Sequence, residues 1–146
     1  RGGSVVTYVK YGSEVCSPVV EKGEADIIIS FEQLEAARYV SYLKKGGHII
    51  TSTQQIDPMP VITGAAQYPA NIVDTLKSLG EDVIAVDALS LAEQAGTSRA
   101  VNVVLMGVIS HILDFGDKVW NDALEQCVPA KVLEVNKKAF GLGRNA

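Results

Sequence analysis

Three short polar segments carry the side chains best placed for chemistry. Residues 30–32, 53–55 and 87–88 each follow an apolar run typical of a buried strand, and they include Glu32 and Gln55. The carboxyl ends of parallel strands meet along one edge of a sheet, and open α/β sheets bind ligands at that edge. We therefore treat the three segments as candidates for binding a ligand or a partner, with Glu32 and Gln55 as predicted cofactor-binding residues.

The carboxylates of these segments also have structural interpretations. Glu32 would lie in the first turn of a helix, where a negative charge complements the helix dipole. Asp87 could cap the helix that follows it. The sequence leaves both interpretations open beside the binding roles.

Two further groups could hold a cofactor. Asn102 stands on an otherwise apolar helix, where an unpartnered carboxamide would cost about 1–3 kcal/mol, so it either ties down a loop or reaches a ligand. Arg1 precedes Gly2, Gly3 and Ser4, so a planar guanidinium would stand beside exposed backbone N–H groups and could clamp an anion. A plain turn before a strand explains the same four residues.

No residues stand at a spacing typical of a catalytic or metal site. The sequence shows no serine–histidine or paired-carboxylate constellation and no phosphate-binding glycine loop. Cys16 and Cys127 are far apart, which favours two buried free thiols, and His48 and His111 are isolated. We expect no catalytic residue and no metal ligand in this chain.

The elements that position these residues begin with three consecutive isoleucines at 27–29. Because polar residues do not alternate with them, this strand should be covered on both faces, as in a parallel sheet flanked by helices. Ser30 and Gln33 have the spacing of a capping box, so a helix should begin at Ser30 and end at the glycines 46–47. A second strand at 48–51 then requires a right-handed crossover.

The rest of the chain alternates in the same way. Further strands are predicted at 4–11 and 83–87, a short strand or connector at 61–64, helices at 72–79, 88–95 and 99–113, two amphipathic helices around 120–127 and 132–140, and a frayed tail at 141–146. The helix at 99–113 is almost without a polar face, so either the domain's own core or a second subunit should bury it. The predicted fold is three-layer α/β/α with a mostly parallel, Rossmann-like sheet.

Length, charge and hydropathy restrict the class of protein. A chain of 146 residues fits a single domain, and a net charge of -4 argues against binding nucleic acid. The longest apolar run, residues 103–109, is far shorter than the roughly 20 residues that span a bilayer, and no signal-like segment precedes it. These features predict a soluble, cytoplasmic protein that binds neither nucleic acid nor membrane.

Short motifs spread over nearly the whole chain occur in a characteristic order. They are Arg-Gly-Gly-Ser-Val at 1–5, Ser-Pro at 17–18, Gly-Glu-Ala-Asp at 23–26, Phe-Glu at 31–32, Leu-Glu-Ala-Ala-Arg at 34–38, Tyr-Leu at 42–43, Gly-Gly at 46–47, Val-Asp-Ala at 86–88, Arg99-x-x-Asn102-x-x-Leu105-x-Gly107 and Val128-Pro129-x-Lys131. Together they resemble the gamma-type domain of 2-oxoacid:ferredoxin oxidoreductases, particularly the beta subunit of the indolepyruvate type.

The resemblance implies a subunit rather than a complete enzyme. Family members decarboxylate a 2-oxoacid on thiamine diphosphate, pass electrons through iron-sulfur clusters to ferredoxin and release an acyl-CoA. For the indolepyruvate type the substrates are arylpyruvates. The resemblance places the thiamine diphosphate and the clusters on a larger partner subunit, in a homo- or hetero-oligomer. It gives this domain a place beside the active site, where it can help to hold coenzyme A or shape the pocket.

Two departures from the family pattern matter. Family domains usually have a strand, a glycine-rich turn and a helix ahead of the Arg-Gly-Gly motif, and their usual Gly-Asn pair is Gly96-Thr97 here. Since the sequence begins at Arg1, we expect residues 1–146 to form one truncated domain whose missing unit contributes a central strand, so that the sheet is incomplete or has a gap that another chain fills. Two other classes stay open: a nucleotide- or CoA-binding module that acts by binding alone, and a structural or assembly module without a ligand.

Overall fold

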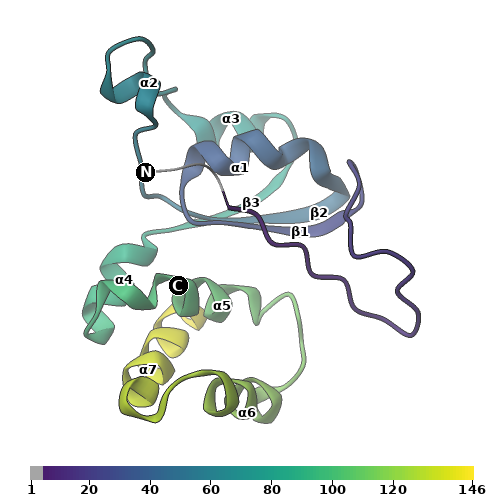
Figure 1. The fold of residues 1–146 in the computed structure, drawn as a ribbon, viewed down its shortest axis with the longest axis vertical. Helices are drawn as coiled ribbons and strands as arrows, with labels where there is room; N and C mark the ends of the chain where they lie inside the picture. Colours follow the sequence, from purple (N-terminus) through teal and green to yellow (C-terminus); the bar gives the residue numbers. More distant parts are fainter. Residues whose placement is uncertain (1–4) are drawn as a thin grey trace.

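Three parallel strands form the centre of the molecule, which is a computed structural model that describes residues 5–146. The strands are β1 (Ala25–Ser30), β2 (Leu43–Ser52) and β3 (Asp82–Val86), in the order β1-β2-β3 (Figure 1). Both pairs of neighbouring strands run parallel. The predicted α/β class and the strands predicted around residues 27–29, 48–51 and 83–87 are therefore confirmed.

Helices cover both faces of this sheet (Figure 1). One face carries the crossover helices α1 (Gln33–Tyr39) and α3 (Ile72–Ser78). The opposite face of the sheet is covered by α4 (Ala88–Ala95), α5 (Val101–Ile109), α6 (Asp117–Cys127) and α7 (Leu133–Arg144). Both crossovers step in the same direction along the sheet, so crossovers of one hand put α1 and α3 on the same side. The result is the predicted three-layer α/β/α arrangement.

The isoleucines of the strands divide between two apolar clusters. Ile28 of β1 and Ile49 of β2 pack into the cluster beneath α1 and α3. Ile27, Ile29 and Ile50 pack into the larger cluster formed with α4, α5 and α7. Alternate side chains along a strand point to opposite faces, so a run of isoleucines supplies both layers at once.

The first helix is shorter than the sequence predicted, at both ends. Its N-cap is Glu32 rather than Ser30, and it ends at Tyr39, followed by a 3-10 turn at Val40–Tyr42. The glycines at 46 and 47, predicted to cap this helix, lie inside β2 instead. Ala25 pairs with Leu43 and Ile27 with His48, so the residues between Leu43 and His48 form a bulge, in which Gly46 has φ +81°.

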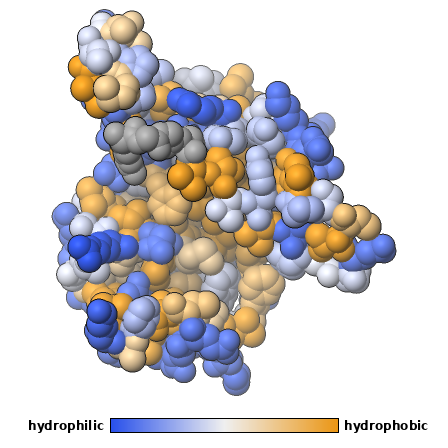
Figure 2. Space-filling view, viewed as in Figure 1, coloured by the Kyte–Doolittle hydropathy of each residue, from blue (hydrophilic) through white to orange (hydrophobic). Residues whose placement is uncertain are grey.

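The strand predicted at 4–11 does not form at residues 5–11, the part of it that the structure describes. Residues 5–24 form no helix or strand, and their side chains are mostly exposed, with Val5 at 91% and Val9 at 77%. Tyr8 and Tyr11 contact the rings of Tyr42 and Phe115 at centroid distances of 6.4 and 5.9 Å. Strand propensity is realised only beside a pairing neighbour, and this segment has ring contacts instead. Figure 2 shows apolar side chains at the surface where the segment crosses the molecule.

The apolar helix and the C-terminal tail also differ from their predictions. A 3-10 turn at Ser98–Ala100 precedes α5, which ends at Ile109, and exposed Asn102 and Met106 give this helix one open edge. The tail predicted to fray is the last part of α7, which continues to Arg144. A Cβ on Gly143 would lie 2.0 Å from the Val104 carbonyl oxygen, so the two helices touch backbone to backbone.

Residues 56–67, between β2 and α3, form an arm that projects from the molecule (Figure 1). The residues predicted as a short strand or connector contribute to a single helical turn, α2 (Met59–Ile62). In the sheet built from residues 5–146, β1 and β3 are the edge strands. The expectation that a preceding strand and helix complete this sheet stays a prediction. No helix of the described chain is long and apolar enough to cross a bilayer.

Candidate functional site at the carboxyl edge of the sheet

The three polar segments meet at the carboxyl edge, as the sequence predicted. Thr53, directly after β2, donates its backbone N–H to the carbonyl oxygen of Val86 at the end of β3, at 2.9 Å. On the other side, the Gln33 side chain donates from Nε2 to the Thr53 carbonyl at 2.6 Å, and its backbone N–H reaches Gln54 O at 3.4 Å. The loop after β2 therefore ties the ends of the neighbouring strands together.

Glu32 is the N-cap of α1 and is 6% exposed. Its Oε1 accepts the Glu35 backbone N–H at 2.6 Å, and its Oε2 accepts the Leu34 N–H at 3.1 Å. Oε2 also accepts the Tyr68 hydroxyl at 2.8 Å. Both carboxylate oxygens thus have partners inside the chain, which favours the capping interpretation of Glu32 over a ligand contact.

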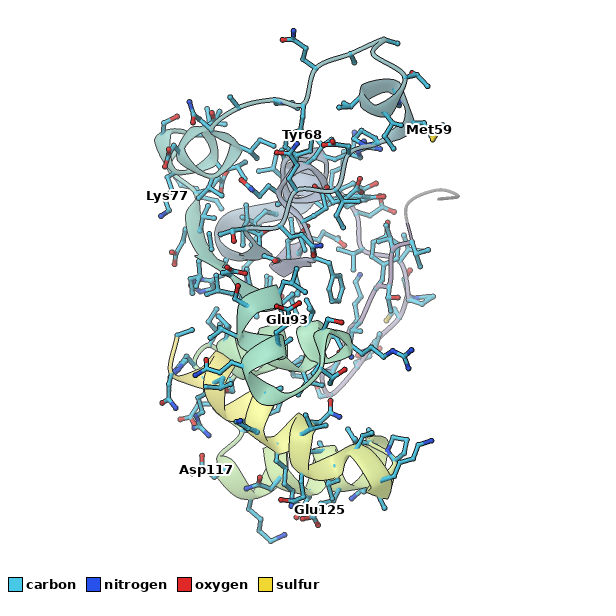
Figure 3. The ribbon with its side chains drawn as sticks, turned by 90° about the vertical axis from the view of Figure 1, so that its left-hand side faces the viewer. Met59, Tyr68, Lys77, Glu93, Asp117 and Glu125 are labelled. Carbon is cyan, nitrogen blue, oxygen red and sulfur yellow. The ribbon has the colours of Figure 1, made fainter. Side chains whose placement is uncertain are left out.

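Tyr68 is a site residue that the sequence did not reveal. It belongs to the segment between the arm and α3, and its hydroxyl joins the first turn of α1 (Figure 3). Burial raises the pKa of Tyr68 above its ordinary value, and the hydrogen bond to the Glu32 carboxylate raises it further. The tyrosine therefore keeps its proton and donates a hydrogen bond to Glu32. The only sequence feature that marked Tyr68 was its position just before Pro69, and that feature predicted only the start of a helix.

Two buried hydroxyl residues at the end of β2 form hydrogen bonds at the start of the loop at residues 53–55. Thr51 and Ser52 close β2 and are completely buried. The Thr51 hydroxyl donates to the Ser52 carbonyl at 3.1 Å, and Ser52 Oγ accepts the Gln54 N–H at 3.3 Å. Sequence reasoning had placed these residues only in a strand and a loop. Their hydroxyl groups directly after an apolar strand were the available signal.

Gln55 is the predicted binding residue at this edge that faces solvent. It is exposed, and its Nε2 donates to Asp57 Oδ1 at 2.6 Å. Beyond it the chain enters the arm, on which Figure 3 labels Met59. Met59 and Ile62 are 55% and 65% exposed. Gln55 can turn its carboxamide toward a ligand or a neighbouring subunit without uncovering a buried group.

Asp87 adopts its structural role. As the N-cap of α4 it accepts the Ser90 backbone N–H at 3.0 Å and the Ser90 hydroxyl at 2.7 Å. The hydroxyl bond, followed by the backbone bond, holds the pKa of Asp87 below its ordinary value. A charged cap is consistent with the start of a helix, where a carboxylate is stabilised.

The other predicted cofactor-binding residues lie elsewhere. Asn102 is exposed on α5 in the opposite layer, so the argument that its buried carboxamide needs partners was wrong. Arg1, Gly2, Gly3 and Ser4 lie outside the described residues, and their proposed anion clamp stays a prediction.

Cysteine and histidine side chains do not gather. Cys16 and Cys127 are both exposed, so their predicted burial was wrong. His48 Nδ1 lies 2.7 Å from Asp82 Oδ2 on the neighbouring strand, and His111 Nε2 contacts the Arg144 carbonyl oxygen. Within residues 5–146 no group of three histidine, cysteine, aspartate or glutamate residues could hold a metal ion.

Fold and site together define a three-layer α/β domain in which the loops at the carboxyl edge are tied to one another. A solved structure with this fold is the gamma subunit of a keto/oxoacid ferredoxin oxidoreductase from Geobacter sulfurreducens PCA, with a TM-score of 0.61 and 20% identity. The match covers 84% of this chain and 64% of that one, so the chain spans less than two thirds of that subunit.

Sequence comparison identifies the family. The chain belongs to the pyruvate ferredoxin/flavodoxin oxidoreductase family, whose model matches residues 1–146. It is 40% identical to the indolepyruvate oxidoreductase subunit IorB of Thermococcus kodakarensis and 39% identical to that of Pyrococcus horikoshii; each match covers 100% of this chain and 75% of the relative. The IorB subunit of Archaeoglobus fulgidus is 36% identical over 99% of this chain and 74% of its own length. The family resemblance inferred from the motifs is thereby confirmed.

Proposed function

We propose that this chain is a subunit of an indolepyruvate-type 2-oxoacid:ferredoxin oxidoreductase. The complex would use thiamine diphosphate to decarboxylate arylpyruvates, form the acyl-CoA and pass the electrons to ferredoxin. The observation that carries the proposal is the 36–40% identity, over nearly the whole chain, to proteins named as subunits of indolepyruvate oxidoreductase. An oxidoreductase subunit is also what the family model supports.

The donor groups of this chain do not fit an iron-sulfur cluster. Such clusters are held by four thiolates, and the sequence contains two cysteines. These two are exposed, Cys16 in the irregular N-terminal segment and Cys127 at the end of α6. We therefore assign the clusters, together with the thiamine diphosphate, to a larger partner subunit, and derive no electron-transfer step through this chain.

The part proposed for this chain is to shape the active site from its carboxyl edge. Glu32 and Tyr68 hold the first turn of α1 against the segment that follows the arm. Gln55 stands on the adjoining loop with its carboxamide exposed. It is the residue we propose to contact coenzyme A or the 2-oxoacid in the assembled enzyme, with the Arg1–Ser4 segment and Asn102 as further candidates.

The test is purification followed by kinetics. The native protein should copurify with a larger subunit that carries thiamine diphosphate and cysteine-rich motifs, and the pair should oxidise indolepyruvate in the presence of coenzyme A. In that complex Gln55→Ala should raise the KM for coenzyme A or indolepyruvate about three- to tenfold, the effect of one lost hydrogen bond. Gln126→Ala, which removes an exposed carboxamide from α6, is the control.

Two outcomes would overturn parts of this proposal. Turnover by the chain without a companion polypeptide would contradict the subunit assignment. An active complex in which Gln55→Ala matches Gln126→Ala would remove the carboxyl edge from the reaction and favour a purely structural role for this chain.

A further inference from the structure

A groove opens in the helical layer, away from the carboxyl edge of the sheet. It lies where the 3-10 turn before α5 faces the last residue of α6 and the start of α7, and has a volume of about 690 Å³. Its walls include Ala100, Val103, Val128, Val132 and Val135. The groove therefore offers an apolar wall to part of a ligand.

The charged side chains that line the groove are both cationic. They are Arg99 and Lys131, and no aspartate or glutamate is among the lining residues. Other cations of the described chain, such as Lys137 and Arg144, have carboxylate partners at 2.7 and 2.6 Å. Neither Arg99 nor Lys131 has such a partner within residues 5–146. Other lysines of the described chain, such as Lys77, also lack a carboxylate partner, but the groove brings two such cations together with no acidic lining residue, in a protein of net charge -4.

Polar groups of the lining add hydrogen-bonding capacity. Asn102 stands in the first turn of α5, and its carboxamide has no hydrogen-bond partner within the described chain. Asn136 donates from Nδ2 to the Val132 carbonyl at 2.8 Å, which leaves its carbonyl oxygen for another partner. Asn102 can donate to an anion without breaking an existing bond, beside a helix N-terminus whose dipole favours negative charge.

We propose that this groove binds a small organic anion, with its phosphate or carboxylate group on Arg99 and Lys131 and its apolar part along the valines. Guanidinium and ammonium groups without carboxylate partners are free to make charge-assisted hydrogen bonds to such a group. The inference goes beyond the proposed function, since the groove lies away from the carboxyl edge and shares with the candidates named there only Asn102; it holds whichever substrate the complex uses.

The two cysteines of the chain can report the electrostatic potential of the groove, one as the probe and the other as the control. Cys127 is exposed and lines the groove, whereas exposed Cys16 lies outside it, with Sγ 3.5 Å from Glu14 Oε1. Iodoacetate and iodoacetamide alkylate thiols alike but differ in charge. The ratio of their rates at each cysteine, read by peptide mass spectrometry on the full-length protein in its native assembly, therefore measures the local potential.

The expected ratio of iodoacetate to iodoacetamide rates is about threefold higher at Cys127 than at Cys16, and high salt should lower it. Arg99→Gln and Lys131→Gln should each reduce the ratio at Cys127, whereas Lys77→Gln, an exposed lysine on α3, should leave it unchanged. Phenyl phosphate should slow alkylation of Cys127 by iodoacetamide but not that of Cys16, and phenol at the same concentration should protect less.

Three results would overturn the inference. Equal ratios of the iodoacetate and iodoacetamide rates at the two cysteines would show that the groove has no positive potential. If phenyl phosphate did not slow the alkylation of Cys127, the groove would not bind an organic anion. A Cys127 that reacts with neither reagent in the native assembly, but with both after dissociation, would show that a partner polypeptide covers the groove instead.

Discussion

Glu32 shows how a residue suited to binding can be committed to structure. A carboxylate beside the end of a strand is well placed for a ligand, yet here both oxygens accept bonds from α1 and from Tyr68. A buried charge is stable in such a place because three donors replace its hydration. Two of these bonds cap α1, and the third, from Tyr68, joins two segments that are 36 residues apart in the sequence.

Removal of this carboxylate should therefore reduce stability. Glu32→Ala should lower the free energy of unfolding by about 1–3 kcal/mol, because it removes an N-cap and leaves the Tyr68 hydroxyl without its acceptor. Chemical denaturation of the purified protein measures the change. Glu93→Ala, an exposed position on α4, should stay within about 0.5 kcal/mol of the wild type. Equal losses in the two variants would contradict the capping role.

Tyr68 should make the stability depend on pH in the alkaline range. Its pKa is raised in the folded chain above the ordinary value of 10.0, so the folded state keeps a proton that the unfolded state releases. The stabilisation is fully present below the unfolded pKa and is lost as pH rises from there through the folded pKa.

The stability difference between the wild type and Tyr68→Phe should therefore be about 1 kcal/mol at neutral pH and should shrink above about pH 10. Denaturation of both proteins across this range tests the sign. Tyr11→Phe, which alters an exposed ring, is the control. A difference that grows with rising pH would exclude a neutral Tyr68 as the donor to Glu32.

At the scale of elements, the contact between α5 and α7 depends on two glycines. A Cβ on Gly107 would lie 2.2 Å from the Phe140 carbonyl oxygen, and one on Gly143 would lie 2.0 Å from that of Val104. Both obstacles are backbone atoms, which a change of rotamer cannot move. This close approach keeps residues 141–144 helical, where sequence reasoning expected a frayed tail.

Gly143→Ala should destabilise the protein by at least about 2 kcal/mol, because the two helices must separate to admit one methyl group. Gly141→Ala is the matched control: it lies in the same helix, and its added Cβ would meet no atom within 4 Å. Since alanine is the better helix former by about 1 kcal/mol, the control should be neutral or stabilising. Thermal denaturation of both variants checks the pair. A neutral Gly143→Ala would show that the helices have room to part.

The elements that the sequence predicted well are those fixed by their own residues. The isoleucine strands and the helix ends near Gly80 and Gly96, with φ +86° and +127°, depend on local apolar pattern and local backbone conformation. The choice between Ser30 and Glu32 as the cap was not local. Both have a suitable side chain, and the hydroxyl of distant Tyr68 favours Glu32.

Two other misjudged segments have the same cause. The lysines and glycines at 44–47 resemble the end of a helix, but Leu43 is buried with Ala36 and Ile49, which draws the chain into β2 early. Residues 5–11 have strand propensity but pair with no strand of the described sheet. Of the predicted site, the meeting of the three loops followed from topology, whereas the exposure of Gln55 and Asn102 required the three-dimensional packing.

The whole molecule consists of two apolar clusters separated by one sheet. The cluster beneath α1 and α3 contains Ile49, and the cluster among α4, α5 and α7 contains Ile50 and Trp120. The two isoleucines are neighbours on β2 and are both completely buried. Neither cluster can therefore lose its packing without disturbing the strand that the other also needs.

This arrangement predicts one cooperative unfolding transition. Trp120 is the sole tryptophan of the chain, so its fluorescence reports on the cluster opposite to Ile49. Ile49→Ala should lower stability by about 2–5 kcal/mol, and the urea midpoint of Trp120 fluorescence should fall as far as that of far-ultraviolet circular dichroism. Ile62→Ala, at a 65% exposed position on the arm, should leave both midpoints nearly unchanged. If Ile49→Ala shifted the dichroism midpoint alone, the two layers would unfold as separate units.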